Sequence, residues 1–453
     1  MNNGSIAAIS TPAGEGGIGV IRISGENAIE IADKVFKSVS GKKLSMLCGY
    51  SALFGHIYSG DEMIDEAVCT VFLAPKSYTG ENVCEISCHG GNYVTKAVLR
   101  AVLAAGAVSA EPGEFTKRAF LNGKMDLAQA ESVAGLIASK GEQELKLHLA
   151  AKNGKTSGEI DRAEKLLLEF SANLAAYSDY PDEDLPELSS DNFQRLLSEA
   201  LSLLDGMIST YDTGKILREG VRTAIVGKPN VGKSTLMNLL AGSARSIVTD
   251  IAGTTRDIVE DTVRCGEITL CLADTAGIRE TDDVVENAGV SLAKERIENA
   301  QLILAVFDSS VPLDEDDKQI LELVKGKNCI VILNKTDKGD VINGSDFDGF
   351  VTVRISAKNG VGEKELETKI AEITGAKTLD SSAAVLLSER QRDLSVKARD
   401  FTAEALDLIK SGMTMDAVGI LIDEALSYLY AFDGKRVTNE VADEVFRRFC
   451  VGK

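Results

Sequence analysis

The first quarter of the chain alternates short apolar runs with polar turns marked by glycine. Most of these runs have the alternation of strands, and two segments between them repeat apolar residues at helical spacing. Such a mixture predicts an α+β domain over residues 1–118. The predicted strands cover residues 6–9, 19–23, 50–57, 64–72 and 83–86, and the predicted helices cover residues 28–39 and 93–105.

From Phe115 onward the apolar residues change to helical spacing. Three further amphipathic stretches are predicted to be helices, at residues 142–151, 160–178 and 192–210. The acidic, proline-marked run 179–187 between two of them is predicted to be a solvated connection.

An α/β pattern then interrupts the helices, which return toward the end of the chain. Chain ends that lie close together tolerate insertions, so we expect one discontinuous all-α domain with an α/β domain inserted in it. The helical parts are predicted at residues 119–217 and 378–453, and the α/β domain at residues 218–377. The alternative is two separate helical domains.

The stretch from Gly227 to Ser234 lies between a strand-like run and a helical one, which is the context of a phosphate-binding loop. Its sequence, GKPNVGKS, has the P-loop spacing, in which backbone N–H groups turn toward phosphate oxygens. Lys233 adds a positive charge near the β- and γ-phosphates, and the Ser234 hydroxyl is a ligand for Mg²⁺. The sequence therefore predicts a nucleotide site.

Two segments that follow the P-loop have the residues expected around the γ-phosphate. Asp274 ends an apolar strand and would reach Mg²⁺ through its water shell, while the Gly277 amide would meet the γ-phosphate. In the segment 253–257, GTTRD, a threonine hydroxyl can join Mg²⁺ and make this loop sensitive to the γ-phosphate.

Two later motifs predict recognition of guanine. Asn334-Lys335-Thr336-Asp337 follows an apolar strand, and the Asp337 carboxylate can accept hydrogen bonds from the N1–H and the exocyclic amine of guanine. Adenine has an acceptor at N1 and would leave this carboxylate unsatisfied, so the motif selects GTP over ATP. The segment 356–358, SAK, completes the base side.

The glutamine that orients the attacking water in Ras-like proteins is replaced here by Ile278, which cannot do so. The water must therefore be positioned otherwise. The acidic run Glu280, Asp282, Asp283 and Glu286 follows directly, although such a run is usually only the solvated start of a helix.

Composition limits the remaining possibilities. The formal net charge is −20 over 453 residues, so any contact with RNA would need a local basic patch. The scattered cysteines favour buried free thiols in a reducing compartment, and Cys84, Cys88 and His89 lack a nearby fourth ligand for a metal site. The chain begins without a leader pattern and has no apolar run of membrane-spanning length, which predicts a cytoplasmic protein.

These motifs, together with both ends of the chain, resemble the MnmE/TrmE family of tRNA-modification GTPases. The likeness runs from Ile6 to Lys453, and its most specific parts are PGEFTKRAFLNGK at 112–124 and FCVGK at 449–453. The resemblance implies a multidomain α+β protein. Its parts would be an N-terminal folate-binding-like domain, a discontinuous all-α helical domain and an inserted Ras-like α/β P-loop GTPase domain.

For the nucleotide domain, the resemblance implies a K⁺-activated GTPase that dimerises across the nucleotide, with K⁺ in place of an arginine finger. It assigns K⁺ to Asn230, Thr249, Ile251 and Thr254, and Mg²⁺ to Ser234 and Thr255. Glu286 would orient the water, and Arg256 and Asp257 are further catalytic candidates of this domain; Cys450, in the C-terminal motif, is the remaining catalytic candidate. The residues assigned to GTP are Asn230, Val231, Gly232, Lys233, Ser234, Thr235, Thr249, Asp250, Ile251, Ala252, Gly253, Thr254, Thr255, Asp274, Thr275, Ala276, Gly277, Asn334, Lys335, Thr336, Asp337, Ser356, Ala357 and Lys358.

For the N-terminal domain, the resemblance implies 5-formyl-tetrahydrofolate held by Arg22, Glu85, Lys124 and Lys453, and a homodimer. Basic side chains suit the carboxylates of the folate tail, and a carboxylate suits the N–H donors of the pterin. Without the resemblance, Arg22 and Glu85 would be an ordinary exposed strand face.

The family acts with an FAD flavoprotein of the MnmG/GidA type and involves no membrane. Together they add an aminomethyl or carboxymethylaminomethyl group at C5 of the wobble uridine, position 34, of certain tRNAs. The alternative is a regulatory or ribosome-assembly GTPase that binds RNA or protein without modification chemistry.

Overall fold

A computed structural model of the protein describes residues 4–139, 141–179, 189–242, 261–266, 268–272, 297–342, 344–375, 384–412, 415–436, 438–447 and 449–452. The chain divides into two compact units. The first comprises Met1–Ala138, Ala151–Asp205 and Ser388–Lys453, and the second comprises Ser139–Ala150 and Gly206–Leu387.

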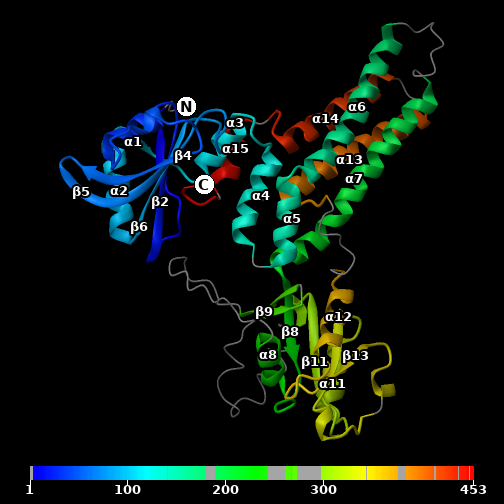
Figure 1. The fold of residues 1–453 in the computed structure, drawn as a ribbon. Coiled ribbons are helices and arrows are strands. Elements are labelled where there is room, and N and C mark those ends of the chain that lie inside the picture. The colour runs from blue at the N-terminus through cyan, green and yellow to red at the C-terminus, as the bar shows by residue number, and fades with distance from the viewer. Residues whose placement is uncertain are drawn as a thin grey trace. The chain divides into compact units, whose positions relative to one another are not determined.

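The first unit begins with a seven-stranded sheet in the order β3-β4-β5-β6-β2-β1-β7. Neighbouring strands pair antiparallel except β1 and β7, which are parallel. Two helices pack on the sheet, and the apolar residues between the layers form one core (Figure 1). The strands are β1 Ile6–Ile9, β2 Gly16–Ser24, β3 Phe36–Ser38, β4 Ser51–Ser59, β5 Glu62–Phe72, β6 Val83–Gly90 and β7 Val108–Ser109, and the helices are α1 Ala28–Val35, η1 Leu44–Met46 and α2 Asn92–Ala104.

The predicted helix 28–39 is wrong at its carboxyl end. α1 ends at Val35, and the next residues form the edge strand β3, in which Phe36 is extended and pairs with Ile57 of β4. From Phe36 the buried and exposed positions alternate along the strand, so the period changes from that of a helix to that of a strand. Packing against β4 overrides the local helical spacing.

Helices from distant parts of the chain form the rest of the first unit. α6, α7, α13 and α14 lie side by side, and α4 packs against α15 near the end of the chain (Figure 1). Leu127 and Val133 of α4 share a core with Phe446 of α15, so the helices before and after the α/β segment belong to one discontinuous domain. The alternative of two separate helical domains is therefore wrong. The helices of this unit are α3 Glu114–Leu121, α4 Leu127–Ala138, α6 Lys155–Asp179, α13 Glu389–Lys410, α14 Met415–Asp433, α15 Asn439–Arg447 and the first half of α7 Ser190–Glu219. Most of α5 Glu142–Lys152 and the second half of α7 belong to the second unit.

The second unit is built around a six-stranded sheet in the order β13-β12-β11-β8-β10-β9. All pairs are parallel except β10 with β9, and buried apolar residues fill both faces, as expected for a sheet covered by helices. The strands are β8 Val221–Val226, β9 Asp261–Cys265, β10 Ile268–Leu272, β11 Leu302–Asp308, β12 Cys329–Asn334 and β13 Val351–Arg354. The helices are α8 Lys233–Gly242, α11 Glu315–Val324, η3 Thr336–Lys338, η4 Gly344–Phe347 and α12 Glu363–Ile373.

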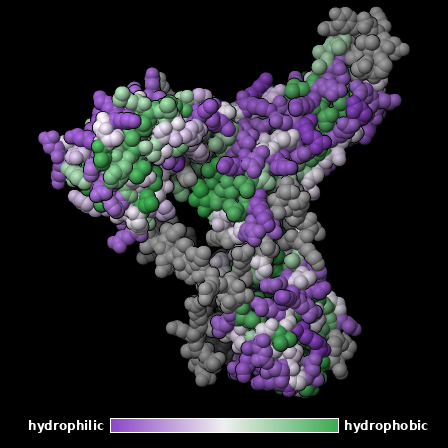
Figure 2. Space-filling model, in the orientation of Figure 1, coloured by the Kyte–Doolittle hydropathy of each residue, from purple (hydrophilic) through white to green (hydrophobic). Residues whose placement is uncertain are grey.

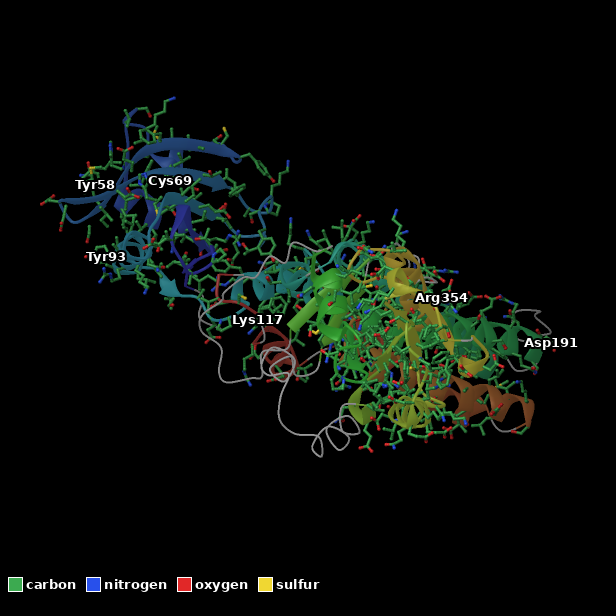
Figure 3. The ribbon with its side chains drawn as sticks, turned by 90° about the horizontal axis from the view of Figure 1, so that it is seen from below. Tyr58, Cys69, Tyr93, Lys117, Asp191 and Arg354 are labelled. Atoms are coloured by element: carbon green, nitrogen blue, oxygen red, sulfur yellow. The ribbon has the colours of Figure 1, made fainter. Side chains whose placement is uncertain are left out.

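The cysteines differ in exposure. Cys69 lies in the N-terminal core (Figure 3), but Cys48 and Cys450 are exposed, so the expectation of buried thiols is wrong for these two. Both lie outside helices and strands, where no core covers them. Among the helices in the described part of the chain, none is long and apolar enough to cross a membrane.

Candidate functional site

The P-loop lies at the carboxyl end of β8, whose two neighbours in the sheet are β11 and β10. In doubly wound sheets, ligands bind at the carboxyl ends of the strands, at the point where the strand order reverses. Gly227 has φ of 151°, and a Cβ there would collide with the carbonyl oxygen of Val306. Glycine at this position therefore brings the loop close to β11.

Lys233 is the first residue of α8, and its Nζ atom folds back onto the loop that precedes it. It donates to the carbonyl oxygens of Gly227 at 2.8 Å and Lys228 at 2.6 Å. Ser234 and Thr235 are exposed in the first turn of α8. The backbone N–H groups at the start of a helix favour a bound phosphate. The Lys233 ammonium and the hydroxyls of Ser234 and Thr235 therefore lie at the end of α8 that favours phosphate.

Asn334, at the end of β12, connects the phosphate side of the site to the base side. Its side chain is buried, and its Nδ2 atom donates to the carbonyl oxygen of Val231 at 2.9 Å. Its Oδ1 atom accepts from the Ala357 N–H at 3.0 Å. Gly232 has φ of 102°, and a Cβ there would collide with the Asn334 amide. The asparagine thus fixes the P-loop relative to the segment 356–358.

Lys335 makes a second connection to the P-loop. Its Nζ atom donates to the Asn230 carbonyl oxygen at 2.5 Å and forms an ion pair of 2.6 Å with Asp308, the last residue of β11. Asp308 was not predicted from the sequence, although a carboxylate at the end of a buried strand is the same signal that singled out Asp274. Asn230 itself is exposed, with φ of 64°.

Asp337 and Ser356 face each other on the base side. The Ser356 hydroxyl donates to Asp337 Oδ1 at 2.6 Å, and this hydrogen bond holds the pKa of the exposed Asp337 carboxyl below its ordinary value. The carboxylate is therefore ionised at neutral pH and can accept hydrogen bonds from two adjacent donors, such as the N1–H and the exocyclic amine of guanine. Thr336 and Lys358 flank these two residues in sequence.

The remaining nucleotide-site predictions lie outside the described residues. They are Thr249, Asp250, Ile251, Ala252, Gly253, Thr254, Thr255, Arg256, Asp257, Asp274, Thr275, Ala276, Gly277 and Glu286.

In the first unit, Arg22 and Glu85 lie opposite each other on β2 and β6 and form an ion pair of 2.8 Å. The Arg22 guanidinium also lies over the rings of Tyr78 and Phe115, at 5.4 Å and 5.6 Å from their centroids. This pair is not an ordinary exposed strand face, because the Arg22 side chain is only 15% exposed. Two aromatic rings and a charged pair therefore lie together, and a flat ring can make favourable contacts with such groups.

The end of the chain packs beside this pair. Val451 forms a bridge with Pro112, and the Gly452 carbonyl oxygen accepts from Ser10 Oγ at 3.0 Å and from Arg22 at 3.5 Å. Gly452 has φ of 94°, and a Cβ there would collide with the Ile9 carbonyl oxygen. The contacts of Ser10 and Gly452 span almost the whole chain, so no local sequence signal could have indicated them.

Lys124 joins the same region through the loop 75–81. Its Nζ atom donates to the Pro75 carbonyl oxygen at 3.0 Å, while Tyr78 of this loop contacts Arg22 and shares a hydrogen bond of 2.8 Å with Thr116. Lys453 lies outside the described residues. The Cys450 side chain is exposed, and its carbonyl oxygen accepts from the Gly113 N–H at 3.3 Å.

Comparison with known proteins decides the family. Residues 5–124 match the model of the GTP-binding protein TrmE N-terminus, and residues 127–450 match that of the MnmE helical domain. A tRNA modification GTPase MnmE from Clostridioides difficile (strain 630) is 40% identical over 99% of both chains. The chain belongs to the MnmE family. Another MnmE, from Alkaliphilus oremlandii (strain OhILAs), is 39% identical over 99% of both chains.

A solved structure also resembles part of this MnmE-family chain. The G domain of the T. maritima FeoB iron transporter is 24% identical, covers 34% of this chain and 98% of its own, and has a TM-score of 0.26.

Proposed function

We propose that this protein hydrolyses GTP in the cytoplasm as part of a tRNA-modifying complex. With an MnmG/GidA-type flavoprotein that supplies FAD, it adds an aminomethyl or carboxymethylaminomethyl group at C5 of the wobble uridine of certain tRNAs. The observation that carries this proposal is the 40% identity to an MnmE over 99% of both chains. Its functional parts are residues 1–118, 119–217, 218–377 and 378–453.

GTP is the substrate because the described half of the site suits guanine and phosphates. Asp337 is ionised beside Ser356, and Asn334 and Lys335 tie the base side to the P-loop. In the reaction Lys233 moves its ammonium from loop carbonyls to the phosphates. Such an arrangement stabilises charge that develops on the phosphoryl oxygens.

Two cations complete this proposal. Mg²⁺ is held by Ser234 and Thr255, and the exposed Ser234 hydroxyl is the oxygen donor that a hard cation prefers. K⁺ is held by Asn230, Thr249, Ile251 and Thr254; Asn230 lies exposed on the loop, which leaves its side-chain oxygen accessible. When bound, the cations neutralise phosphate charge, as an arginine finger does elsewhere. Glu286 orients the water, and Arg256 and Asp257 are the other catalytic candidates of this domain.

A folate, 5-formyl-tetrahydrofolate or a relative, binds at Arg22, Glu85, Lys124 and Lys453. The cation–π contacts of Arg22 with Tyr78 and Phe115 and the nearby Glu85 carboxylate support this part of the proposal, because a pterin is planar and presents N–H donors to a carboxylate. Cys450 lies in the C-terminal segment whose Gly452 contacts Arg22. Its side chain is exposed, so its thiol is accessible to chemistry at the folate site.

The N-terminal sheet provides the surface for a homodimer. Phe54 of β4 and Val68 of β5 lie opposite each other and are 50% and 41% exposed, and Met63 near the start of β5 is 48% exposed. Figure 2 shows hydrophobic side chains gathered on the visible face of this part, surrounded by hydrophilic ones. Exposed apolar side chains on a sheet are typical of an interface.

The test is the wobble uridine of tRNA from a deletion strain, measured by mass spectrometry. The modified uridine should disappear, return with the wild-type protein, and stay absent with Lys233→Ala. Lys318→Ala, on the exposed surface of α11, is the matched control and should restore it. Full modification in the deletion strain would refute the tRNA role and favour an assembly GTPase.

A further inference from the structure

Three carboxylates converge between α6 and the carboxyl end of α14. Asp161 and Glu164 are three residues apart on α6, which places them on one face of that helix. Asp433 is the last residue of α14. One oxygen from each carboxylate lies within 4.8 Å of the others. Glu164 and Asp433 are buried, at 8% and 4% exposure.

The turn after α14 places a lysine beside these carboxylates. Gly434 has φ of 84°, the conformation that ends helices and reverses the chain, so Lys435 folds back over the last turn. Its Nζ atom lies 2.9 Å from Asp161, 2.7 Å from Glu164 and 3.5 Å from Asp433. A side chain other than glycine at 434 would collide with the Phe120 ring, so this turn is built into the fold.

The cluster has more negative charge than this one ammonium balances. A fourth carboxylate, Asp126, repels Asp433, and its own Oδ1 atom accepts from the Gln129 N–H. Arg390 is committed to the carbonyl oxygens of Ala431 and Phe432 at the end of α14 and to Glu131.

Asp433 is the clearest sign that a ligand is needed. Its Oδ1 atom is fully buried and has no hydrogen-bond partner among the described residues, although a buried carboxylate oxygen normally has one. Leaving this oxygen unpaired is unfavourable, and a bound cation would give it a partner.

We propose that Asp161, Glu164 and Asp433 bind one divalent cation that prefers oxygen, namely Mg²⁺, Mn²⁺ or Ca²⁺, in exchange for the Lys435 ammonium. Oxygens that share Ca²⁺ at about 2.3–2.6 Å lie at most about 5 Å apart, which 4.8 Å satisfies, whereas the shorter bonds of Mg²⁺, about 2.1 Å, would require the carboxylates to move closer together. The three ligands are carboxylates, without the histidine or cysteine that zinc prefers. Lys435 can leave because its side chain is 44% exposed.

Such a cation would join α6 to the end of α14, directly before the turn that leads to α15. It would replace one positive charge by two in a cluster of four carboxylates, Asp126 included. Charge balance therefore predicts that the cation and the ammonium compete, and that losing the lysine strengthens cation binding.

The experiment uses the full-length, nucleotide-free protein after EDTA treatment and dialysis, with Mn²⁺ binding followed by electron paramagnetic resonance. Ser234→Ala is present in every sample, to remove the candidate Mg²⁺ ligand of the nucleotide site. The Ser234→Ala protein, which serves as the background, should bind one Mn²⁺ per chain, and Ca²⁺ or Mg²⁺ should displace it. Asp433→Asn and Glu164→Gln should each weaken binding about tenfold or more, and Lys435→Gln should strengthen it about threefold or more.

The matched control is Glu169→Gln, an exposed carboxylate on the same helix, which should bind Mn²⁺ like the background. Thermal unfolding provides a second readout. Lys435→Gln should lose stability in EDTA and regain it with Mn²⁺ or Ca²⁺, whereas Lys435→Gln combined with Asp433→Asn should not respond. If the background binds no Mn²⁺, if the carboxylate variants bind as tightly as it does, or if Lys435→Gln gains no stability from either cation, the proposal is wrong.

Discussion

The Lys228 ammonium of the P-loop lies 2.8 Å from the carboxylate of Asp317 on α11. Asp317 is almost fully buried, at 3% exposure, and also accepts from the Asp314 N–H at the start of its helix. Asp314 caps α11 and forms a second ion pair with Lys228, at 2.5 Å. The Lys228 carbonyl oxygen meanwhile accepts from Lys233. One lysine thus connects the helix cap of α11 to the loop that holds phosphate.

Lys228→Met should weaken GTP binding by about threefold to tenfold and lower stability. The substitution leaves the Asp317 carboxylate buried without a cation, which costs about 1–3 kcal/mol or more and loosens the loop. Titration with a fluorescent GTP analogue measures the affinity. Lys228→Arg should keep most of it, and Lys318→Met, which removes only an exposed ion pair with Glu315, should change nothing. Unchanged affinity in Lys228→Met would mean that the contact does not position the loop.

Arg22→Ala should lower the affinity for 5-formyl-tetrahydrofolate by about tenfold or more. It removes the guanidinium that contacts the rings of Tyr78 and Phe115 and leaves Glu85 without its partner. Isothermal titration measures the change. The control is Arg100→Ala on α2, an exposed arginine that contacts only the Tyr93 ring among the contacts described, and it should bind folate normally. If the wild-type protein does not bind 5-formyl-tetrahydrofolate, the proposed folate site is wrong.

Asn230→Ala should abolish the preference of GTP hydrolysis for K⁺ over Na⁺. In the wild type K⁺ should raise turnover strongly, because a cation at this loop stabilises charge on the phosphates in the transition state. Turnover is measured in matched KCl and NaCl, so that ionic strength is constant. A variant that keeps the full response to K⁺ would exclude Asn230 as a K⁺ ligand.

His148 should make the protein less stable in mild acid. Burial, with the charge of Arg218, lowers the pKa of this imidazole to about 4, below its ordinary value of 6.5. The folded state therefore binds fewer protons than the unfolded state between these values, so its stability is full above about pH 6.5 and falls toward pH 4.

Thermal unfolding at pH 7.5 and pH 5.5 measures this effect. His148→Gln cannot be protonated, so its melting temperature should fall less between the two pH values than that of the wild type. His56→Gln on β4 is the matched control and should follow the wild type. Equal slopes for His148→Gln and the wild type would show that His148 does not set the acid sensitivity.

The sequence predicted most strands and helices because their apolar spacing and turn residues agree. β1 and the P-loop with its flanking β8 and α8 lie where the spacing placed them, and α7 extends the predicted helix 192–210 to Glu219. The failure was β3, whose pairing with β4 outweighs the helical spacing that runs on from α1. Long-range pairing has no signal in a local window.

The residues of the candidate sites were predictable where they belong to a local sequence motif. Asn334, Asp337 and Ser356 lie together as the motifs indicated. Tyr78, Gly452 and the ion pair of Lys228 with Asp317 were not indicated, because each depends on residues that are distant in sequence. The same holds for Asp433 and Lys435, whose acidic partners on α6 precede them by more than half of the chain.

The central claim is that this site hydrolyses GTP and recognises guanine through Asp337. Its most direct test is to measure kcat/KM for GTP and for xanthosine triphosphate with the wild-type protein and with Asp337→Asn. Xanthine has a carbonyl where guanine has its amine, so an asparagine amide can donate where the carboxylate accepted. The account predicts that the wild type prefers GTP strongly and that Asp337→Asn prefers xanthosine triphosphate. Unchanged preference for GTP in Asp337→Asn would contradict it.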